Sequence, residues 1–314
     1  MTLACHVLGA TGLEVTELCM GTSPLASMPQ LYGYDVDDER AVATIAAVLD
    51  SAIRFIDTSN GYGAHGEAEK RIGLALGGRG LPRDLVLATK VDPDPATGDF
   101  SRKRVFASYE ESLERLGVER VPLLYLHDPE RIRFEEALAS GGPVEALVRL
   151  REQGRVDHIG VAGGPVELLG RYLDTGCFDV LLSHNRYTLL DRSAEGLFVS
   201  AHSRGIGVIN AAPYGGGMLA KGPDVQARYG YGARDERVAD AARSMAAACR
   251  SFGVPLAAAA LGFSLRAPFI DSTVVGVSSP ERVAQTLGYA ALEIPGALWA
   301  ELETMVPPPE CWLG

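Results

Sequence analysis

Residues 85–128 of the chain read LVLATKVDPDPATGDFSRKRVFASYEESLERLGVERVPLLYLHD. Apolar runs at 85–91 and 121–128 have the character of buried strands, and an amphipathic pattern at 101–116 separates them. Ser101 stands where a helix needs an N-cap hydroxyl, and Gly117 stands where many helices end in a left-handed glycine. The stretch therefore predicts a strand–helix–strand unit.

The same alternation continues in both directions along the chain. The apolar runs mostly lack a polar residue at every second position, which is typical of parallel strands buried on both faces. Eight strands are expected, at residues 17–23, 54–59, 85–91, 121–128, 158–163, 179–185, 207–213 and 272–278. Helical patterns lie between them, for example at residues 38–51, 101–116, 144–153, 193–204 and 236–252. Eight repeats predict an α/β fold, a (β/α)8 TIM barrel that forms a single domain over residues 1–314.

An open, doubly wound sheet is the alternative arrangement of alternating strands and helices. The first strand–helix turn, Gly21-Thr22-Ser23-Pro24, lacks the G-x-G-x-x-G pattern of dinucleotide-binding sheets, and this favours the barrel. We also expect an N-terminal β-hairpin, with strands at 6–8 and 14–16 and a turn at Thr11-Gly12. An extra C-terminal helix and a tail should follow the barrel, and the tail could cap the site or lie on the surface.

The composition limits the classes of function. A net charge of −11 disfavours nucleic acid or an anionic membrane as a partner, although a local basic pocket for a phosphorylated cofactor is compatible with it. The N-terminal residues show no secretory signal, and the longest apolar run, 255–263, is too short for a membrane span. Five scattered cysteines without C-x-x-C spacing indicate reduced thiols in the cytoplasm, and neither disulfides nor a metal site.

Ionisable side chains occur at the ends of three consecutive expected strands. Asp57, Lys90 and His127 each close an apolar run, and Tyr62 follows Asp57 in the next loop. Buried charges are costly unless they satisfy one another, so these groups should meet at the carboxyl ends of the strands, where barrel enzymes keep their catalysis. Taken alone, Asp57 and Lys90 could form a structural ion pair, and His127 could be a satisfied core histidine.

Four segments carry a resemblance to a known family. FIDTSNGYG (55–63), EAEKRIGLAL (67–76), LATK (87–90) and LLYLHDP (123–129) resemble the motifs of the aldo-keto reductases, in the same order and at matching spacings. The resemblance implies a catalytic tetrad of Asp57, Tyr62, Lys90 and His127. A phenol is a poor proton shuttle at neutral pH, but a nearby ammonium favours the phenolate. Asp57 would hold Lys90 charged, and His127 would hydrogen-bond the substrate oxygen.

The resemblance also implies a nicotinamide cofactor that lies across the barrel mouth. Glycines in the loop 212–220 would let backbone N–H groups approach a pyrophosphate, although a flexible surface loop has the same composition. The last strand and the start of the last helix would bind the adenosine end, unless Ser279 only caps that helix. The expected cofactor contacts are Gly21, Thr22, Asp57, His184, Pro213, Tyr214, Gly215, Gly216, Gly217, Met218, Leu219, Lys221, Gly276, Ser278, Ser279, Arg282 and Gln285.

Several positions depart from the family pattern. The Ser-Asn pair that usually binds the carboxamide is replaced by Ala162-Gly163, and His184 stands where a glutamine is usual. The aromatic residue that stacks on nicotinamide is replaced by Ala211, with Tyr214 as a possible substitute. Gly276 matches a lysine that many NADPH-preferring members use. We therefore expect NAD as the preferred cofactor, with NADP tolerated.

The segments LHDP, SHNRYTLLD and PYGGGML resemble a sub-group of the family, the aldose 1-dehydrogenases and pyridoxal 4-dehydrogenases. This implies oxidation of the anomeric hydroxyl of an aldose (L-fucose, D-arabinose or D-galactose type), or of pyridoxal, to a lactone. Leu31 and Tyr32 could contact the substrate. His65 could do so too, unless it is an exposed loop histidine. A broad NADPH-dependent carbonyl reductase is the main alternative. A nucleotide-binding regulatory barrel is a minor one, because it has no use for a buried tetrad.

Overall fold

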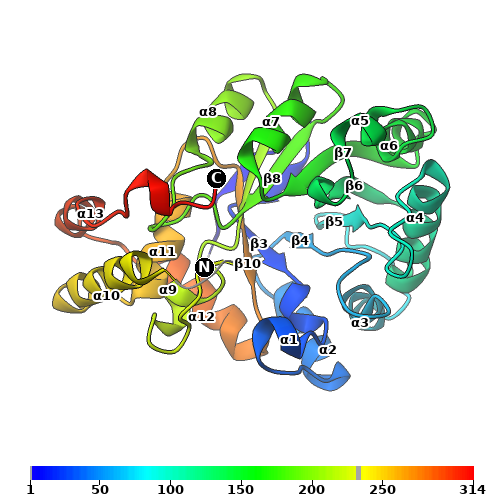
Figure 1. The fold of residues 1–314 in the computed structure, drawn as a ribbon. Coiled ribbons are helices and arrows are strands. Elements are labelled where there is room, and N and C mark those ends of the chain that lie inside the picture. The colour runs from blue at the N-terminus through cyan, green and yellow to red at the C-terminus, as the bar shows by residue number, and fades with distance from the viewer. Residues whose placement is uncertain (1, 231–234) are drawn as a thin grey trace.

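Eight parallel strands close into a barrel in the computed structural model, which describes residues 2–230 and 235–314 (Figure 1). The order around the barrel is β10-β3-β4-β5-β6-β7-β8-β9, so neighbours in sequence are neighbours in space. The strands are β3 (Leu18–Gly21), β4 (Phe55–Asp57), β5 (Val86–Val91), β6 (Val121–His127), β7 (Val156–Gly163), β8 (Val180–His184), β9 (Gly207–Ala211) and β10 (Ser272–Gly276). The predicted TIM barrel is confirmed, and each strand lies within its expected run or starts slightly before it.

Helices surround the barrel between successive strands. The longer ones are α2 (Asp38–Leu49), α3 (Glu67–Leu76), α4 (Arg102–Leu116), α6 (Pro143–Glu152), α7 (Val166–Asp174), α8 (Glu195–Ser203), α10 (Glu236–Ser251), α11 (Leu256–Leu265), α12 (Pro280–Ala290) and α13 (Gly296–Glu303). Short helical segments are η1 (Ser23–Leu25), α1 (Pro29–Tyr32), η2 (Pro129–Arg131), α5 (Phe134–Leu138), α9 (Met218–Lys221) and η3 (Pro309–Cys311). The Ser101 hydroxyl caps α4 by accepting from Arg104 N, and Gly117 ends α4 with a φ of 67°, as expected.

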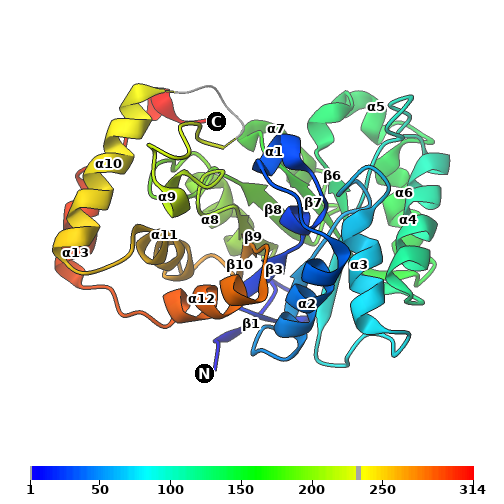
Figure 2. The ribbon, with the colours of Figure 1, turned by 90° about the horizontal axis from the view of Figure 1, so that it is seen from below.

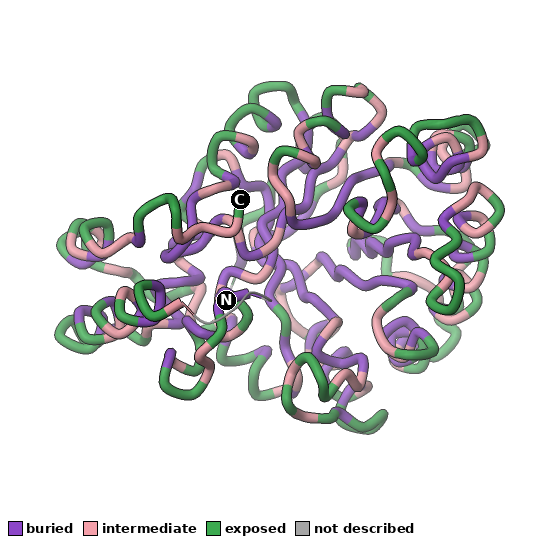
Figure 3. The backbone as a smooth tube through the Cα atoms, viewed as in Figure 1, coloured by how far each residue is buried: buried purple, intermediate pink, exposed green. Residues whose placement is uncertain are grey.

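Two apolar clusters form the core. The outer cluster lies between the barrel and its helices, and the inner cluster fills the barrel with Phe55, Tyr125 and Ile209 among others. Figure 3 shows the strands almost uniformly buried, with exposure concentrated on the outer turns of the helices. The predicted hairpin, β1 (Cys5–Val7) paired antiparallel with β2 (Glu14–Thr16), contributes Leu8 and Val15 to the inner cluster. The hairpin therefore closes one end of the barrel and leaves the other end for a site.

The C-terminal tail lies at the end of the barrel opposite the hairpin (Figure 2). It follows α13, and its last residues pack on the segment after β8, where Arg186 Nε donates to the Gly314 carbonyl at 2.7 Å and Leu313 N donates to Asp191 at 2.7 Å. The tail thus reaches the carboxyl ends of the strands.

Within the described ranges, no single helix has the length and apolarity needed to cross a membrane. Helices α10 and α11 meet those criteria only as a pair, across a bend of 98°. The connection between β9 and α10 contains α9, and its residues 231–234 lie outside the described part of the chain.

Candidate active site

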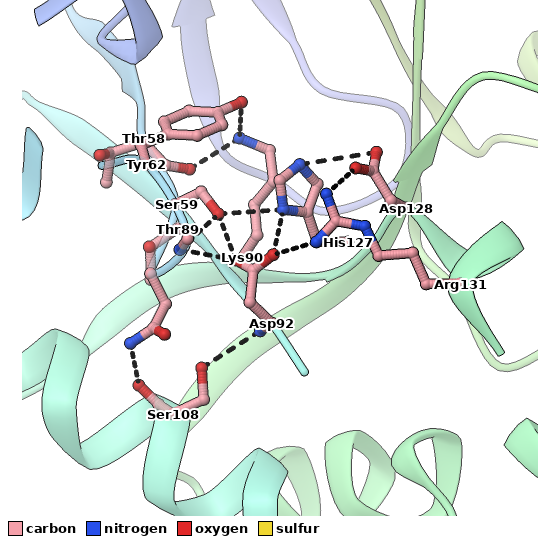
Figure 4. Close-up of polar contacts among 12 residues, drawn as sticks. Thr58, Ser59, Tyr62, Thr89, Lys90, Asp92, Ser108, His127, Asp128 and Arg131 are labelled. Atoms are coloured by element: carbon pink, nitrogen blue, oxygen red, sulfur yellow. Dashed lines mark hydrogen bonds and ion pairs between the residues drawn. The ribbon is translucent and has the colours of Figure 1, made fainter. Parts of the chain in front are cut away.

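The ends of β4 and β5 bring together three of the expected tetrad residues. Lys90 Nζ lies 2.6 Å from Asp57 Oδ1, 3.0 Å from the Tyr62 hydroxyl and 2.7 Å from the Thr58 carbonyl oxygen (Figure 4). The three acceptors match the three N–H bonds of an ammonium group, which makes its burial tolerable. Lys90 is only 1% exposed, so its charge acts on Tyr62 and Asp57 with little screening by water.

The electrostatics of this group follow from burial and from the Lys90 charge. Burial raises the pKa of Asp57, and the Lys90 ammonium acts in the opposite direction. The same ammonium lies 4.5 Å from the centroid of the Tyr62 ring, close to its hydroxyl. A positive charge at that distance stabilises a phenolate more than a phenol. The arrangement suits a tyrosine that exchanges a proton.

His127, at the end of β6, lies beside Tyr62 with an edge-to-face ring contact and a centroid distance of 5.6 Å. Its Nδ1 atom contacts Asp92 Oδ1 at 2.7 Å and the Ser59 hydroxyl at 3.0 Å. The sequence interpretation missed both Asp92 and Ser59. Strand periodicity was the available signal for Asp92, because residues two apart on a strand share a face and Asp92 follows Lys90 by two.

The opposite side of the barrel mouth carries His184 and Asn185. Burial lowers the pKa of His184 to about 4, so the ring is neutral at physiological pH. Asn185 Nδ2 lies 3.2 Å from His184 Nδ1. Because an amide N–H donates, Nδ1 accepts and the ring proton lies on Nε2. Asn185, which the sequence interpretation also missed, has a left-handed backbone with a φ of 62°.

The missing Ser-Asn pair on β7 has a steric explanation. A Cβ atom on Gly163 would lie 2.8 Å from Pro129 Cδ, so η2 occupies the space that a side chain would need. A Cβ on Gly164 would lie 2.6 Å from the Arg186 guanidinium, but this is the end of a flexible side chain and can move aside.

The glycine loop after β9 forms a compact turn around downstream residues. A Cβ on Gly215 would meet the Tyr229 ring at 2.2 Å, and one on Gly216 would meet the Gly230 carbonyl at 2.6 Å. Several of its backbone N–H groups donate within the loop, namely those of Gly215, Gly217, Met218 and Leu219. The first two glycines are therefore required by packing, a role that the sequence interpretation, with its phosphate loop or flexible surface loop, did not include. Pro213 is buried, as are Met218 and Leu219.

Lys221, at the end of α9, places its Nζ atom 5.6 Å from the centroid of the Tyr34 ring. Tyr34 belongs to the loop after β3, so Lys221 spans from one loop of the barrel mouth to another. Tyr214 is near Tyr289 and Arg282 of α12, and burial raises its pKa. This places Tyr214 toward α12.

The remaining expected cofactor residues lie at the ends of β3 and β10. Thr22 donates to the Asp57 carbonyl from both its N–H, at 3.0 Å, and its hydroxyl, at 3.1 Å. Gly21 pairs with Asp57 and with Gly276 in the barrel. Ser278 follows β10, and Ser279 then caps α12 by accepting from Arg282 N at 3.4 Å. The Arg282 guanidinium donates to the side-chain amide oxygen of Gln285 on the exposed side of α12.

The structure places the three expected substrate residues in two loops. Leu31 is 43% exposed on α1, and the Tyr32 hydroxyl donates to Ser23 Oγ at 2.7 Å. His65 is exposed beyond Tyr62, and its backbone N–H donates to Glu67 at 2.9 Å.

Comparisons with known proteins agree with this architecture. Residues 17–306 match the model of the aldo/keto reductase family. The chain is 35% identical to the D-threo-aldose 1-dehydrogenase of a Pseudomonas species, over 93% of this chain and 94% of that protein. It is 30% identical to the pyridoxal 4-dehydrogenase of Microbacterium luteolum (95% and 96% covered) and 33% identical to the L-galactose dehydrogenase of Arabidopsis thaliana (90% and 86% covered).

A solved aldo-keto reductase from Bacillus halodurans, in its holo form, has the same fold with a TM-score of 0.80. It is 22% identical in sequence and the match covers 97% of this chain and 96% of that one. Fold, motifs and relatives together define a nicotinamide-dependent barrel oxidoreductase. The chain belongs to the aldo/keto reductase family.

Proposed function

We propose that this chain oxidises the anomeric hydroxyl of an aldose, or the hemiacetal hydroxyl of pyridoxal, to a lactone. The observation that carries the proposal is the buried contact series from Asp57 through Lys90 to the Tyr62 hydroxyl, with distances of 2.6 Å and 3.0 Å. It supplies a base at a position where a C–OH group can be deprotonated. Relatives that are 30–35% identical carry aldose or pyridoxal dehydrogenase names, which supports this substrate class.

Two buried hydrogen-bond acceptors are suited to binding the nicotinamide nucleoside. Asp57 Oδ2 and Asn185 Oδ1 are both buried, and neither has a hydrogen-bond partner among residues 2–230 and 235–314. A buried acceptor without a donor costs about 1–3 kcal/mol, so both positions favour a ligand that donates. Ribose hydroxyls and a carboxamide N–H2 are such donors. His184, with its proton on Nε2, supplies the complementary donor for a carboxamide oxygen.

Each residue of the tetrad has a separate role in the proposed reaction. The nicotinamide, when bound, accepts a hydride. Tyr62, as phenolate, takes the proton of the substrate hydroxyl, and Lys90 keeps that phenolate stable. His127 donates a hydrogen bond to the same substrate oxygen and fixes its position. Asp57 holds Lys90 in place.

The adenosine end favours NAD. Arg282 is the cation that the start of α12 presents, and Gly276 stands where a second cation would be expected. A Cβ on Gly276 would lie 2.8 Å from the Pro24 ring, so the position is closed to a longer side chain unless that loop moves. NADP is then tolerated through Arg282 alone. Lys221 and the glycine loop, which follow β9, are the residues that we expect to bind the pyrophosphate.

The test is a substrate panel. Purified protein is mixed with NAD and, in turn, with L-fucose, D-arabinose, D-galactose and pyridoxal, and NADH formation and the lactone product are measured. Lactone formation with at least one of them is expected. If NADPH-dependent reduction of simple aldehydes is faster than every oxidation, the chain is a carbonyl reductase and the proposal is wrong.

A further inference from the structure

Asp92 is a buried carboxylate that the tetrad does not include. It directly follows β5, is 3% exposed, and points to the same side of the strand as Lys90 (Figure 4). Its Oδ1 lies 2.7 Å from His127 Nδ1 and 3.4 Å from the Arg131 guanidinium. Its Oδ2 accepts from the Ser59 hydroxyl at 2.5 Å and from Gly61 N at 2.8 Å. Both oxygens are therefore fully engaged by donors, as an ionised carboxylate requires.

The contacts define where the protons of His127 lie. Because Asp92 accepts, Nδ1 carries a proton, and Ser59 uses its single proton on Asp92 while its oxygen faces the same Nδ1. Nε2 lies on the other edge of the ring, 3.7 Å from Asp128 Oδ1. The ring is thus enclosed by carboxylates at both nitrogens.

Other charged and titratable groups also face His127, and they act in both directions. Lys90 of β5 and Arg131 of η2 are cations, Tyr62 lies against the ring, and His184 at the end of β8 is neutral. Burial alone would lower the pKa of His127, but Asp92 and Asp128 outweigh it and raise the pKa above its usual value. Burial alone would raise the pKa of Asp92, but His127, Ser59 and Arg131 outweigh it and hold that pKa well below its usual range.

The same carboxylate also fixes the loop that carries Tyr62. Gly61 immediately precedes Tyr62, and a Cβ on Gly61 would lie 2.7–2.9 Å from the carboxyl atoms of Asp92. The backbone therefore rests directly on the carboxylate, and its N–H bonds to Oδ2 at 2.8 Å. One side chain thereby sets the position of both Tyr62 and His127.

We propose that Asp92 is a positioning residue that keeps His127 doubly protonated and aligned with Tyr62, so that His127 donates its Nε2–H to the substrate oxygen. The inference rests on the proposed function. In the oxidation, the substrate C–H bond breaks with hydride transfer to the nicotinamide, and the O–H proton passes to the Tyr62 phenolate as the C=O bond forms. His127 retains both of its protons throughout. Its positive charge stabilises the negative charge that develops on the oxygen.

The first test measures the ring directly and needs no turnover. Long-range ¹H–¹⁵N spectra of the folded protein report both ring nitrogens, and His127→Gln identifies the His127 signal among the 6 histidines. At pH 6.5, the usual pKa of histidine, we expect both nitrogens of most His127 rings to be protonated in the wild-type protein and one of them to be deprotonated in Asp92→Asn. Asp94→Asn is the matched control, because Asp94 is half-buried and its side chain accepts hydrogen bonds only within its own turn, from Ala96 and Thr97. A neutral His127 in the wild-type protein, or a charged one in a folded Asp92→Asn, would overturn the proposal.

The second test separates positioning from general stability. In Asp92→Asn we expect kcat for lactone formation to fall while KM for NAD stays within a few fold, and the alkaline limb of the kcat/KM profile to move to lower pH. An unchanged pH profile would contradict the role of Asp92. Failure of the proposed function can be told apart from failure of this inference. If the wild-type protein forms no lactone, the protonation state of His127 can still be measured from the spectra. If Asp92→Asn does not fold, the protonation of the two His127 ring nitrogens in the wild-type protein still tests the proposal.

Discussion

Lys90 Nζ and the Tyr62 hydroxyl oxygen are 3.0 Å apart, although the two residues are 28 positions apart in the sequence. The contact joins a fully buried cation to a half-buried phenol, and it places the phenol oxygen on the side of the barrel mouth where Asp57 and His127 also lie. In a medium of low polarity such a cation favours the phenolate strongly. Removal of the Tyr62 hydroxyl oxygen should therefore be enough to abolish the proposed chemistry.

The variant Tyr62→Phe should retain cofactor binding and lose most turnover. General acid–base catalysis contributes about two to four orders of magnitude, so kcat for lactone formation should fall by roughly that factor. Cofactor binding is measured by fluorescence titration and turnover by NADH formation. Tyr109→Phe is a matched control, because it removes a hydroxyl of α4 that donates to the Arg155 carbonyl oxygen in the outer apolar cluster. Turnover within threefold of wild type in Tyr62→Phe would remove Tyr62 from the mechanism.

The variant Asp57→Asn should lower the free energy of unfolding. It leaves the Lys90 ammonium buried without its carboxylate, at a position where the pair is almost fully enclosed. Removing one partner of a buried ion pair costs about 3–5 kcal/mol. Urea unfolding followed by circular dichroism gives the free energy directly. The exposed pair Arg243–Asp240 provides the control, since Asp240→Asn there should change stability by at most about 1 kcal/mol. Equal effects of the two substitutions would show that Lys90 is not held by Asp57.

The contact between Asp92 and His127 should make stability depend on pH in a specific window. The pKa of His127 is raised by Asp92 and Asp128 against the effect of burial, so its contribution is present below about pH 6.5 and is lost as pH rises through the higher folded value. The pKa of Asp92 is lowered by His127, Ser59 and Arg131 against burial, so its contribution is present above about pH 3.9 and is lost as pH falls.

Both contributions are therefore present together between about pH 4 and pH 6.5. The difference in unfolding free energy between the wild-type protein and Asp92→Asn should be largest in that window and shrink at alkaline pH. It is measured by urea unfolding at a series of pH values, with Asp94→Asn as the control. A difference that grows steadily toward alkaline pH would have the wrong sign for this ion pair.

The strand ends were predictable from sequence, and so was the meeting of Asp57, Lys90 and His127. Each lies at the end of an apolar run, and the carboxyl ends of parallel strands in a closed barrel face the same way. Asp92 was not recognised, because it stands just outside the apolar run and looks like the start of a polar loop. Its burial depends on the Gly61 backbone, which arrives from another loop.

The loops were less predictable, because their contacts join segments with no periodic relation. Gly215 and Gly216 precede Lys221 in the same loop and looked like part of a phosphate loop. Instead they pack against Tyr229 and Gly230, which come from further along the same long connection. The left-handed backbone of Asn185 likewise depends on tertiary contacts, since the Tyr229 hydroxyl donates to its carbonyl at 2.6 Å. Composition indicated turns at these places but not what the turns would enclose.

Arg282 should decide how well NADP is used. Its guanidinium is exposed at the start of α12, where Ser279 caps the helix, and the bond to Gln285 holds it on the helix surface. A 2′-phosphate brings close to two negative charges and is bound best by arginine. Loss of one hydrogen bond to a charged group costs about 1.5–3 kcal/mol, so Arg282→Ala should lower kcat/KM for NADP by roughly tenfold to a hundredfold. The effect on NAD should be much smaller, because NAD lacks the phosphate.

The wild-type protein should itself prefer NAD, because Gly276 contributes no cation and Pro24 closes the space above it. Both kcat/KM values are measured with one good aldose at fixed ionic strength, since salt weakens phosphate contacts. Arg243→Ala is the matched control: it removes an exposed arginine of α10 that pairs with Asp224 and Asp240, so it should preserve NADP activity. A tenfold preference of the wild-type protein for NADP would mean that another cation reaches the 2′-phosphate. Lys221 would then be the first residue to substitute, because it is the lysine of the glycine loop and already spans the barrel mouth toward Tyr34.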